Sequence, residues 1–245
     1  MRWGTYTGTP YKAMNTGRWI LLPAFVALVS CASGSGAGSI GPGTVPGQNP
    51  DARAIEREAV LHTAPEGALQ IIFEWRARER EGRFEGRGAA RVQDPYHARL
   101  DLFGPRGEGY LSAALVGDEL RLPRAGSEIE LPPPALLWSV LGIFHPPQGA
   151  ELVATQRDGR KARLDYRRGG DRWRFEFEDG RLRRAEWVPN GGGKHTVELR
   201  GDAAHSLPAE AVYRDWVAFT ELTLKLDEAE RVEPFPPDVW TPGGP

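Results

Sequence analysis

The sequence predicts a mainly β protein: an antiparallel meander of about ten strands with one apolar helix against its concave face. Three observations predict this fold. Apolar residues occupy every second position through most of the chain after Gly67, turn-forming dipeptides separate these runs, and one central segment is apolar on all sides. A period of two is typical of strands with one buried face. The 245 residues are enough for one domain of this kind.

The alternating runs extend over several parts of the chain. Apolar side chains recur at every second position over 69–77, 173–177 and 222–226, mostly with charged or polar residues between them. Asp179-Gly180 and Asn190-Gly191 lie between successive runs, and such dipeptides favour tight hairpin turns. Strands joined in this way pair antiparallel and bury one face.

Two segments depart from the alternation. Residues 51–62 (DARAIEREAVLH) have their less polar positions at helical spacing, which predicts a short helix. Residues 135–147 (ALLWSVLGIFHPP) follow three prolines and end in two more, a pattern that suits the start and the stop of a helix. Because this second segment is apolar all round, we expect it to be buried as a plug or lid on the sheet.

The N-terminal thirty residues have the pattern of an export signal. Residues 19–29 are an apolar run behind the basic Arg18, which is too short to span about 30 Å of hydrocarbon but typical of a signal-peptide core. Leu28-Val29-Ser30-Cys31 follows and resembles the bacterial lipobox. We therefore expect residues 1–30 to be a signal peptide and Cys31 to be lipidated, which anchors the chain to membrane lipid. An ordinary signal with an incidental cysteine is the alternative.

The segment after the cysteine is expected to be a tether. Residues 31–50 are dominated by Gly, Ser and Pro, which indicates a flexible linker before a single domain over 51–245. In lipoproteins of the kind that this signal resembles, Ala32 and Ser33 imply sorting to the outer membrane, with the domain facing the periplasm. Loss of residues 1–30 changes the formal net charge from −2 to −5. This acidic balance excludes a nucleic-acid partner.

The sequence contains no pattern that indicates catalysis. Its single cysteine excludes an internal disulfide and a cysteine-based metal cluster, and the five histidines have no metal-ligand spacing. No serine lies in a G-x-S-x-G motif. His195 falls on an apolar strand face, where a hydrogen-bonded core histidine is favoured over a catalytic one. We predict no catalytic residue, no metal site and no cofactor.

Four stretches resemble the LolA/LolB family of lipoprotein carriers, most closely its LolB members. They are Gly86–Arg91, Arg99–Gly107, Tyr110–Leu115 and the helix around Leu137-Trp138. Members of this family have a half-open barrel of about eleven strands, with helices in its mouth and an apolar cavity for the acyl chains of lipoproteins. The resemblance implies a half-open antiparallel barrel of ten to eleven strands that binds acyl chains or lipoprotein cargo. It further implies a periplasmic LolA-like carrier as a partner and a role in lipoprotein localisation.

The predicted cavity is lined by apolar residues of the strands and of the helix. Small residues at Gly86, Gly88 and Ala90 are expected to leave room inside the sheet, and larger side chains wall that space, each buried acyl CH₂ contributing about 0.8 kcal/mol. Ordinary core packing is the alternative for any one of them. The predicted lining residues are Phe73, Trp75, Leu100, Leu102, Leu115, Leu137, Trp138, Leu141, Phe144, Trp173, Phe175, Phe177, Trp187, Leu222 and Leu224.

One loop departs from the family pattern. LolB proteins have a hydrophobic residue at the tip of the loop after the strand equivalent to Arg99–Phe103, and it helps deliver cargo into the membrane. Arg106 takes that place here, and it can meet lipid phosphates but does not insert as an apolar residue does. Phe103 substitutes if it points outward. The predicted membrane-facing loop is Phe103, Gly104, Pro105, Arg106 and Gly107.

Two further readings of the function remain open. The same fold with a filled core predicts a non-catalytic envelope sensor or interaction lipoprotein, by analogy with related half-barrels. An enzyme is the least favoured reading, because no constellation of polar residues supports it.

Overall fold

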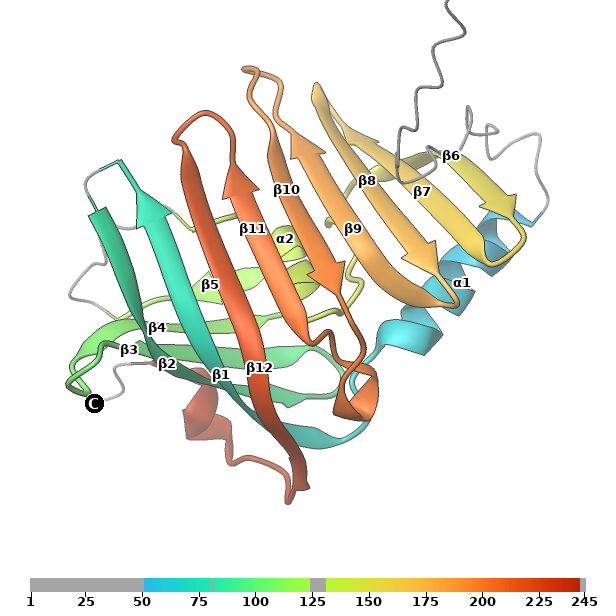
Figure 1. Ribbon diagram of the computed structural model, residues 1–245. Helices are drawn as coiled ribbons and strands as arrows, with labels where there is room; N and C mark the ends of the chain where they lie inside the picture. The colour runs from blue at the N-terminus through green and yellow to red at the C-terminus, as the bar shows by residue number, and fades with distance from the viewer. Residues whose placement is uncertain (1–50, 81, 124–130, 243–245) are drawn as a thin grey trace, which may run out of the picture. The chain divides into compact units, whose positions relative to one another are not determined.

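A computed structural model describes residues 51–80, 82–123 and 131–242 of the chain. The predicted signal peptide, the lipidation site at Cys31 and the tether lie outside the described residues and stay predictions. Figure 1 shows the arrangement of the described elements. Their bounds are α1 (Ala52–Thr63), β1 (Ala68–Glu79), β2 (Gly82–Gln93), β3 (His97–Phe103), β4 (Gly109–Val116), β5 (Glu119–Arg121), α2 (Pro134–Val140), β6 (Glu151–Asp158), β7 (Lys161–Arg168), β8 (Asp171–Glu178), β9 (Arg181–Val188), β10 (His195–Arg200), η2 (Ala204–Ser206), β11 (Glu210–Asp215), β12 (Thr220–Val232) and η3 (Pro237–Trp240).

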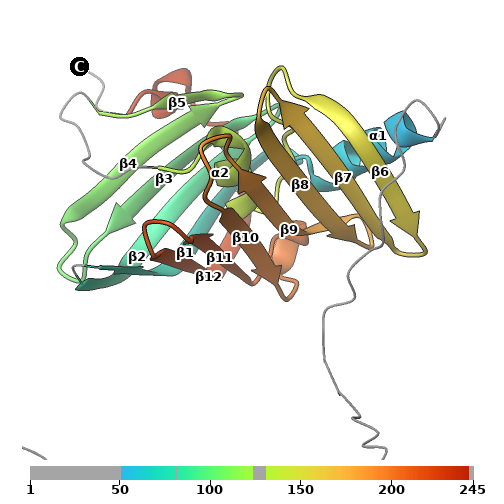
Figure 2. The same ribbon diagram turned by 90° about the horizontal axis from the view of Figure 1, so that it is seen from above.

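The strands form one open antiparallel sheet. Twelve described strands follow the order β5-β4-β3-β2-β1-β12-β11-β10-β9-β8-β7-β6, so pairing of β1 with β12 joins the start of the domain to its end. The sheet is strongly curved. The helix α2 lies on its concave side, between β3 and β4 on one side and β8 on the other (Figure 2). The predicted antiparallel, mainly β fold is confirmed. The number of strands exceeds the predicted ten to eleven, since β5 has three residues and is too short to show an alternating pattern.

The helix α1 is the predicted N-terminal helix. Its buried residues are Ala52, Ile55, Ala59 and Thr63, a spacing of three to four that places them on one face. That face packs against β6 and β9. The hydroxyl of Tyr166 in β7 donates to Glu56 Oε1 at 2.6 Å, which fixes the helix to the edge of the sheet.

The helix α2 begins where the prolines predict but ends earlier than expected. It covers Pro134–Val140, so the prediction of a helix that continues until His145-Pro146-Pro147 stops it is wrong for its last turn. Gly142 has a φ of +77°, and its backbone N–H and that of Ile143 donate to Ser139 and Trp138 carbonyls. A glycine in this left-handed conformation closes a helix C-terminus. The chain then extends across the interior, where Phe144 N donates to Thr63 Oγ1 at 3.0 Å.

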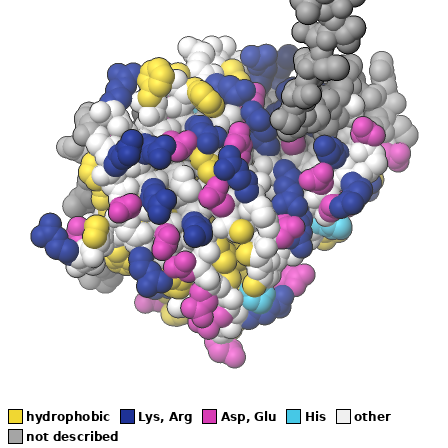
Figure 3. Space-filling view, viewed as in Figure 1, with side chains coloured by type: hydrophobic (Ala, Val, Ile, Leu, Met, Phe, Trp, Pro, Cys, Tyr) yellow, Lys and Arg dark blue, Asp and Glu magenta, His cyan; other side chains and the backbone are white. Residues whose placement is uncertain are grey.

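The two faces of the sheet differ in chemistry. In β8, the buried residues Trp173, Phe175 and Phe177 alternate with charged residues that are exposed or half-buried. The outer face in Figure 3 shows Lys and Arg interleaved with Asp and Glu. Exposed ion pairs of this kind contribute about 0–1 kcal/mol each. The concave face therefore carries the core, as the period of two predicts.

Candidate functional site

An apolar cleft of about 60 Å³ lies beneath α2, on the side facing β3, β4 and β5. We call it the apolar cleft. Among the described residues that line it, all are aliphatic or proline except Tyr213, whose hydroxyl lies 3.0 Å from His195 Nδ1. The lining residues are Ala98, Leu100, Leu111, Ala113, Ala114, Leu115, Leu120, Leu131, Pro132, Leu137, Val140, Leu141, Tyr213 and Leu222.

The cleft exists because short side chains face the helix across it. Ala98 in β3 pairs with Leu115 in β4, and Ala113 in β4 pairs with Leu100, so each pair combines an alanine with a leucine. On the other side, α2 packs against β9, β10 and β11 and presents Leu137 and Leu141, which are only partly buried. The alanines therefore leave a gap that the leucines do not fill.

A second apolar hollow of about 30 Å³ adjoins the cleft. Val140 and Leu141 line both spaces, so the C-terminal end of α2 separates them. The second hollow lies over the centre of the sheet, against β1, β11 and β12. Its lining residues are Ile71, Phe73, Val140, Leu141, Leu207, Pro208, Ala211, Leu224 and Leu226.

The structure divides the predicted cavity residues into two groups. Leu100, Leu115, Leu137, Leu141 and Leu222 line the apolar cleft, and Phe73, Leu141 and Leu224 line the second hollow. The other eight line neither space and pack against other side chains or, for the indole nitrogens of Trp75 and Trp138, donate to backbone carbonyls. These eight are Trp75, Leu102, Trp138, Phe144, Trp173, Phe175, Phe177 and Trp187.

Aromatic stacking explains why part of the interior is closed. Phe144 meets Phe175 and Phe177 at ring-centroid distances of 5.0 and 5.2 Å in edge-on contacts. Trp187 is stacked between Trp173 and His195, at 5.2 and 4.7 Å. His195 also contacts the Tyr213 hydroxyl, as expected for a hydrogen-bonded histidine within the core. Contacts of these kinds are favourable in protein interiors.

The expectation that Gly86 and Gly88 leave room for a ligand is wrong. A Cβ atom on Gly88 would collide with the Phe73 ring, and one on Gly86 would collide with the Phe103 carbonyl oxygen. Trp75 Nε1 donates to that same carbonyl at 3.0 Å. The glycines therefore make room for this chain's own rings and for a close approach of two strands.

The loop predicted to face the membrane is an exposed tight turn. Gly104 N donates to Glu108 O at 2.8 Å, and Arg106 N donates to Glu108 Oε2 at 2.9 Å. Phe103 is 40% exposed, and the Arg106 side chain is in solvent. Phe103 therefore meets the condition, stated above, of pointing outward. Contact of the loop with a membrane stays a prediction.

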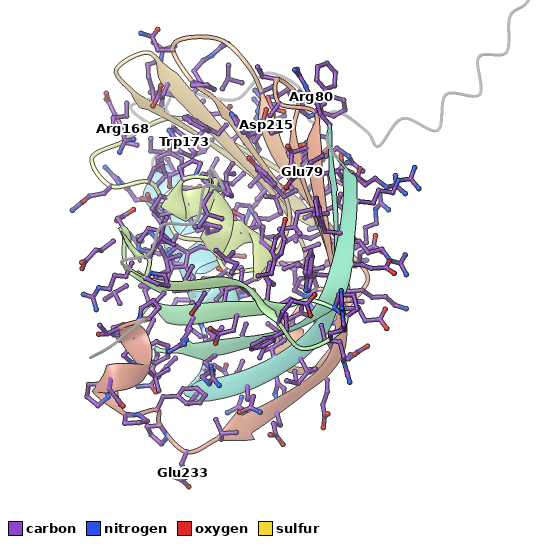
Figure 4. The ribbon with its side chains drawn as sticks, turned by 90° about the vertical axis from the view of Figure 1, so that its left-hand side faces the viewer. Glu79, Arg80, Arg168, Trp173, Asp215 and Glu233 are labelled. Atoms are coloured by element: carbon purple, nitrogen blue, oxygen red, sulfur yellow. The ribbon has the colours of Figure 1, made fainter. Side chains whose placement is uncertain are left out.

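A larger exposed apolar turn connects β11 to β12. Trp216, Val217 and Phe219 are 53%, 59% and 70% exposed, and the Arg80 guanidinium lies 5.3 Å from the centre of the Phe219 ring. Figure 4 shows Arg80 and Asp215 at this end of the sheet, with Glu233 at the opposite end. Sequence reasoning missed this turn, although the run Trp-Val-Ala-Phe between two charged strands is its visible signal.

A larger, mixed pocket of about 300 Å³ lies at the opposite end of the strands, and we call it the charged pocket. It is enclosed by the end of α1, the start of β9, the loop containing η2 and the residues after α2. Arg181 Nη1 and Arg183 Nη1 lie 2.6 and 3.0 Å from Asp202 Oδ1. The hydrogen bond from Arg183, followed by that from Arg181, holds the pKa of Asp202 below its ordinary value.

The described residues show neither a metal centre nor a membrane-spanning helix. No group of three or more His, Cys, Asp or Glu side chains in the described ranges is arranged to hold a metal ion. None of the helices within 51–80, 82–123 and 131–242 has the length and apolar character needed to cross a bilayer.

Comparison with known proteins supports the fold at the level of structure. No protein-family model and no curated protein matches the sequence. A LolA superfamily protein from Nitrosomonas europaea matches with a TM-score of 0.54 and 13% identity, over 78% of this chain and 97% of that chain. An outer membrane lipoprotein-sorting protein domain from Vibrio parahaemolyticus has a TM-score of 0.46 and 9% identity over 76% and 94%. The Pseudomonas aeruginosa MucA/MucB complex has a TM-score of 0.24 and 11% identity, over 72% of this chain and 94% of that chain. The first of these matches shows that the described domain has a LolA-like fold.

Proposed function

We propose that this chain is a non-enzymatic lipoprotein of the bacterial envelope that binds the acyl chains of lipids or lipoproteins beneath α2. The observation that carries the proposal is the apolar cleft, in which a single Tyr hydroxyl is the polar group among the described lining side chains. Hydrocarbon tails are held by burial alone, at about 0.8 kcal/mol for each buried CH₂ before ordering costs are subtracted. The LolA-like fold supports the same function.

The helix α2 acts as the lid in this proposal. The cleft of about 60 Å³ is smaller than the roughly 300–1,000 Å³ of ordinary ligand pockets, so an acyl chain enters only when the helix moves away from β3 and β4. Leu137 and Leu141 are only partly buried and α2 packs mainly against β9, β10 and β11, so the side of α2 that faces β3 and β4 is the one that opens. Trp138 Nε1 donates to Gly117 O, in the turn between β4 and β5, at 2.8 Å. This hydrogen bond either stays intact as the hinge of the lid movement or breaks when α2 moves.

Membrane attachment completes the proposal. The lipobox-like sequence that ends at Cys31 supports a lipid anchor, and residues 32–50 have the composition of a tether. A lipoprotein at the outer membrane, facing the periplasm, meets cargo brought by a periplasmic LolA-like carrier. The exposed turn at Phe103–Gly107 is the part of the domain that we propose to face the bilayer.

Filling the cleft tests the binding proposal. The chain is prepared as residues 31–245 with Cys31→Ala, a form that keeps every described residue, and is titrated with a fluorescent fatty acid after delipidation. Ala113→Leu adds a side chain to the cleft wall, and we expect about tenfold weaker binding, which corresponds to about 1.4 kcal/mol. Ala89→Leu is the matched control, because Ala89 lies on the outer side of β2 between the buried Gly88 and Ala90. No uptake of the probe by the unsubstituted protein would refute the proposal.

A second function is favoured by the closed part of the interior. Eight predicted cavity residues pack within the core, and the turn between β11 and β12 exposes Trp216, Val217 and Phe219. These features support a non-catalytic sensor or interaction lipoprotein that uses its surface. The titration with the fluorescent fatty acid separates the two functions, since a surface-binding sensor takes up no probe.

A further inference from the structure

The charged pocket and the two apolar hollows meet at the end of α2. Leu141 lines all three spaces, and Leu207 and Pro208 line both the second hollow and the charged pocket. The residues that separate the spaces therefore belong to the segment that ends the proposed lid and to the loop after η2. Leu141 thus stands where the charged pocket meets the apolar interior.

The charged pocket is itself two-sided. Its inner part is apolar and includes Leu69, Val92 and Leu182, from three strands of the sheet. Its outer part carries Arg181, Arg183, Asp202, Glu66, Arg231, His62, His205 and Ser206. An apolar floor beneath a charged rim matches the two parts of an amphiphile.

The rim has an excess of positive charge. Arg181 and Arg183 share the carboxylate of Asp202, and Arg231 Nη2 lies 2.7 Å from Glu66 Oε2. Three guanidinium groups thus meet two carboxylates among the described lining residues, and the carboxylate of Glu178 lies just outside the lining, 4.0 Å from Arg183 Nε. Because the mature chain has a formal charge of −5, this local excess opposes the balance of the whole protein.

Arg183 has a nitrogen that could accept a further partner from the pocket. Arg183 Nε is buried and makes no hydrogen bond there, and Glu178 Oε2 lies 4.0 Å away. The charge of this guanidinium is paired with Asp202 through Nη1 and Nη2, but a buried N–H without a hydrogen bond is unfavourable, so an anionic acceptor that reaches Nε would satisfy it. Guanidinium groups bind carboxylate and phosphate oxygens with matching geometry.

The loop on the far side of the rim has an unusual backbone. His205 and Ser206 have φ values of 56° and 62°, in the left-handed region that side chains other than glycine rarely adopt. Strained residues of this kind cluster at binding sites, where surrounding contacts hold them. Both residues line the pocket.

We propose that the charged pocket binds the anionic headgroup of an amphiphile whose hydrocarbon chain continues past Leu141 into the apolar cleft. The headgroup is an oxyanion, either a carboxylate or a phosphate, received by Arg183 and Arg181. The pocket volume of about 300 Å³ is in the range of small-molecule sites. This inference rests on the proposed function, since it assigns the class of ligand that the apolar cleft accepts.

The test compares ligands that differ only in the headgroup. Isothermal titration calorimetry of residues 31–245 with Cys31→Ala measures laurate and lauryl alcohol below their micellar concentrations. We expect laurate to bind about tenfold more tightly, as a charge-assisted hydrogen bond predicts. Arg183→Gln is expected to bring the ratio of the two dissociation constants close to one. Arg76→Gln is the matched control, because Arg76 is an exposed arginine of β1 beside Glu85, and it keeps the tenfold ratio.

The outcomes separate this inference from the proposed function. Equal binding of laurate and lauryl alcohol to the unsubstituted protein overturns the headgroup site and leaves acyl-chain binding intact. Failure of both ligands to bind overturns both proposals. Lauryl phosphate and inorganic phosphate identify the source of the anion: much tighter binding of lauryl phosphate supports an amphiphile. Equal binding of the two phosphates shows a site for a free anion and overturns the inference.

Discussion

The two halves of the concave interior are built on the same sheet but differ in how they are filled. Beside β7 and β8, rings from the strands and from Phe144 close the interior, and Phe144 and Phe175 are completely buried. Beside β3 and β4, Ala98 and Ala113 face α2 across the apolar cleft. Both halves show the same alternation of apolar and polar residues. The size of the inward side chains, rather than their period, decides whether the interior is solid or hollow.

The difference has an energetic meaning. Protein interiors are close-packed, so a side chain surrounded by rings contributes its full contact energy. A leucine beside a gap makes fewer of those contacts, so less free energy is needed to displace it. The half beside β7 and β8 is therefore the stable part of the domain, and the half beside β3 and β4 is where opening is least costly.

The largest expected effect is on the filled half. Phe144→Ala removes a ring that contacts Phe175, Phe177 and Tyr166, and we expect the free energy of unfolding to fall by about 3–5 kcal/mol. Leu137→Ala, at a partly buried position beside the apolar cleft, is expected to cost less than half as much. Urea denaturation of both variants measures the two values. Equal losses in the free energy of unfolding would show that the two halves do not differ in packing.

Adding volume is expected to destabilise the filled half more than the apolar cleft as well. Ala185 in β9 is completely buried and pairs with Phe175, so Ala185→Leu overpacks the filled half and destabilises the protein by about 1–3 kcal/mol. Ala113→Leu places the same added atoms in the apolar cleft. We expect its free energy of unfolding to stay within about 0.5 kcal/mol of the unsubstituted protein. A large loss for Ala113→Leu in urea denaturation would show that the cleft has no spare room.

The sequence was sufficient to predict the fold because its signals are local. Alternation in β1 and β8, the Asp179-Gly180 turn and the prolines before α2 each predict one element, and the structure has all of them. The early end of α2 was not predicted, since Gly142 lies within an apolar run that continues to Phe144. A left-handed glycine is visible only in its backbone angles.

The site was predicted only in part, because the cavity and the core are both built from apolar residues at alternating positions. Leu137 and Leu141 line the apolar cleft, whereas the neighbouring Trp138 and Phe144 are buried in the core. Leucines prevail among the lining residues and aromatic residues in the core, but Phe73 lines the second hollow and Leu102 lies in the core, so residue type alone does not decide. The charged pocket was missed altogether, since it also needs Arg231 of β12, which meets Glu66 before β1 only through the pairing of the first and last long strands.

The last expected effect concerns a polar contact at the margin of the filled half. Burial, followed by the hydrogen bond to Glu56, raises the pKa of Tyr166 above its ordinary value. The unfolded chain ionises this phenol near pH 10 whereas the folded protein keeps it neutral, so its contribution to stability is complete below pH 10 and is lost as pH rises further. Tyr166→Phe is expected to lower the free energy of unfolding by about 1.5–3 kcal/mol at neutral pH, since the hydrogen bond joins a charged acceptor. Urea denaturation at neutral pH and above pH 10 measures both effects. Because the substituted protein lacks the phenol, its stability should fall less steeply with alkali, and an unchanged slope would show that Tyr166 does not link α1 to the filled half.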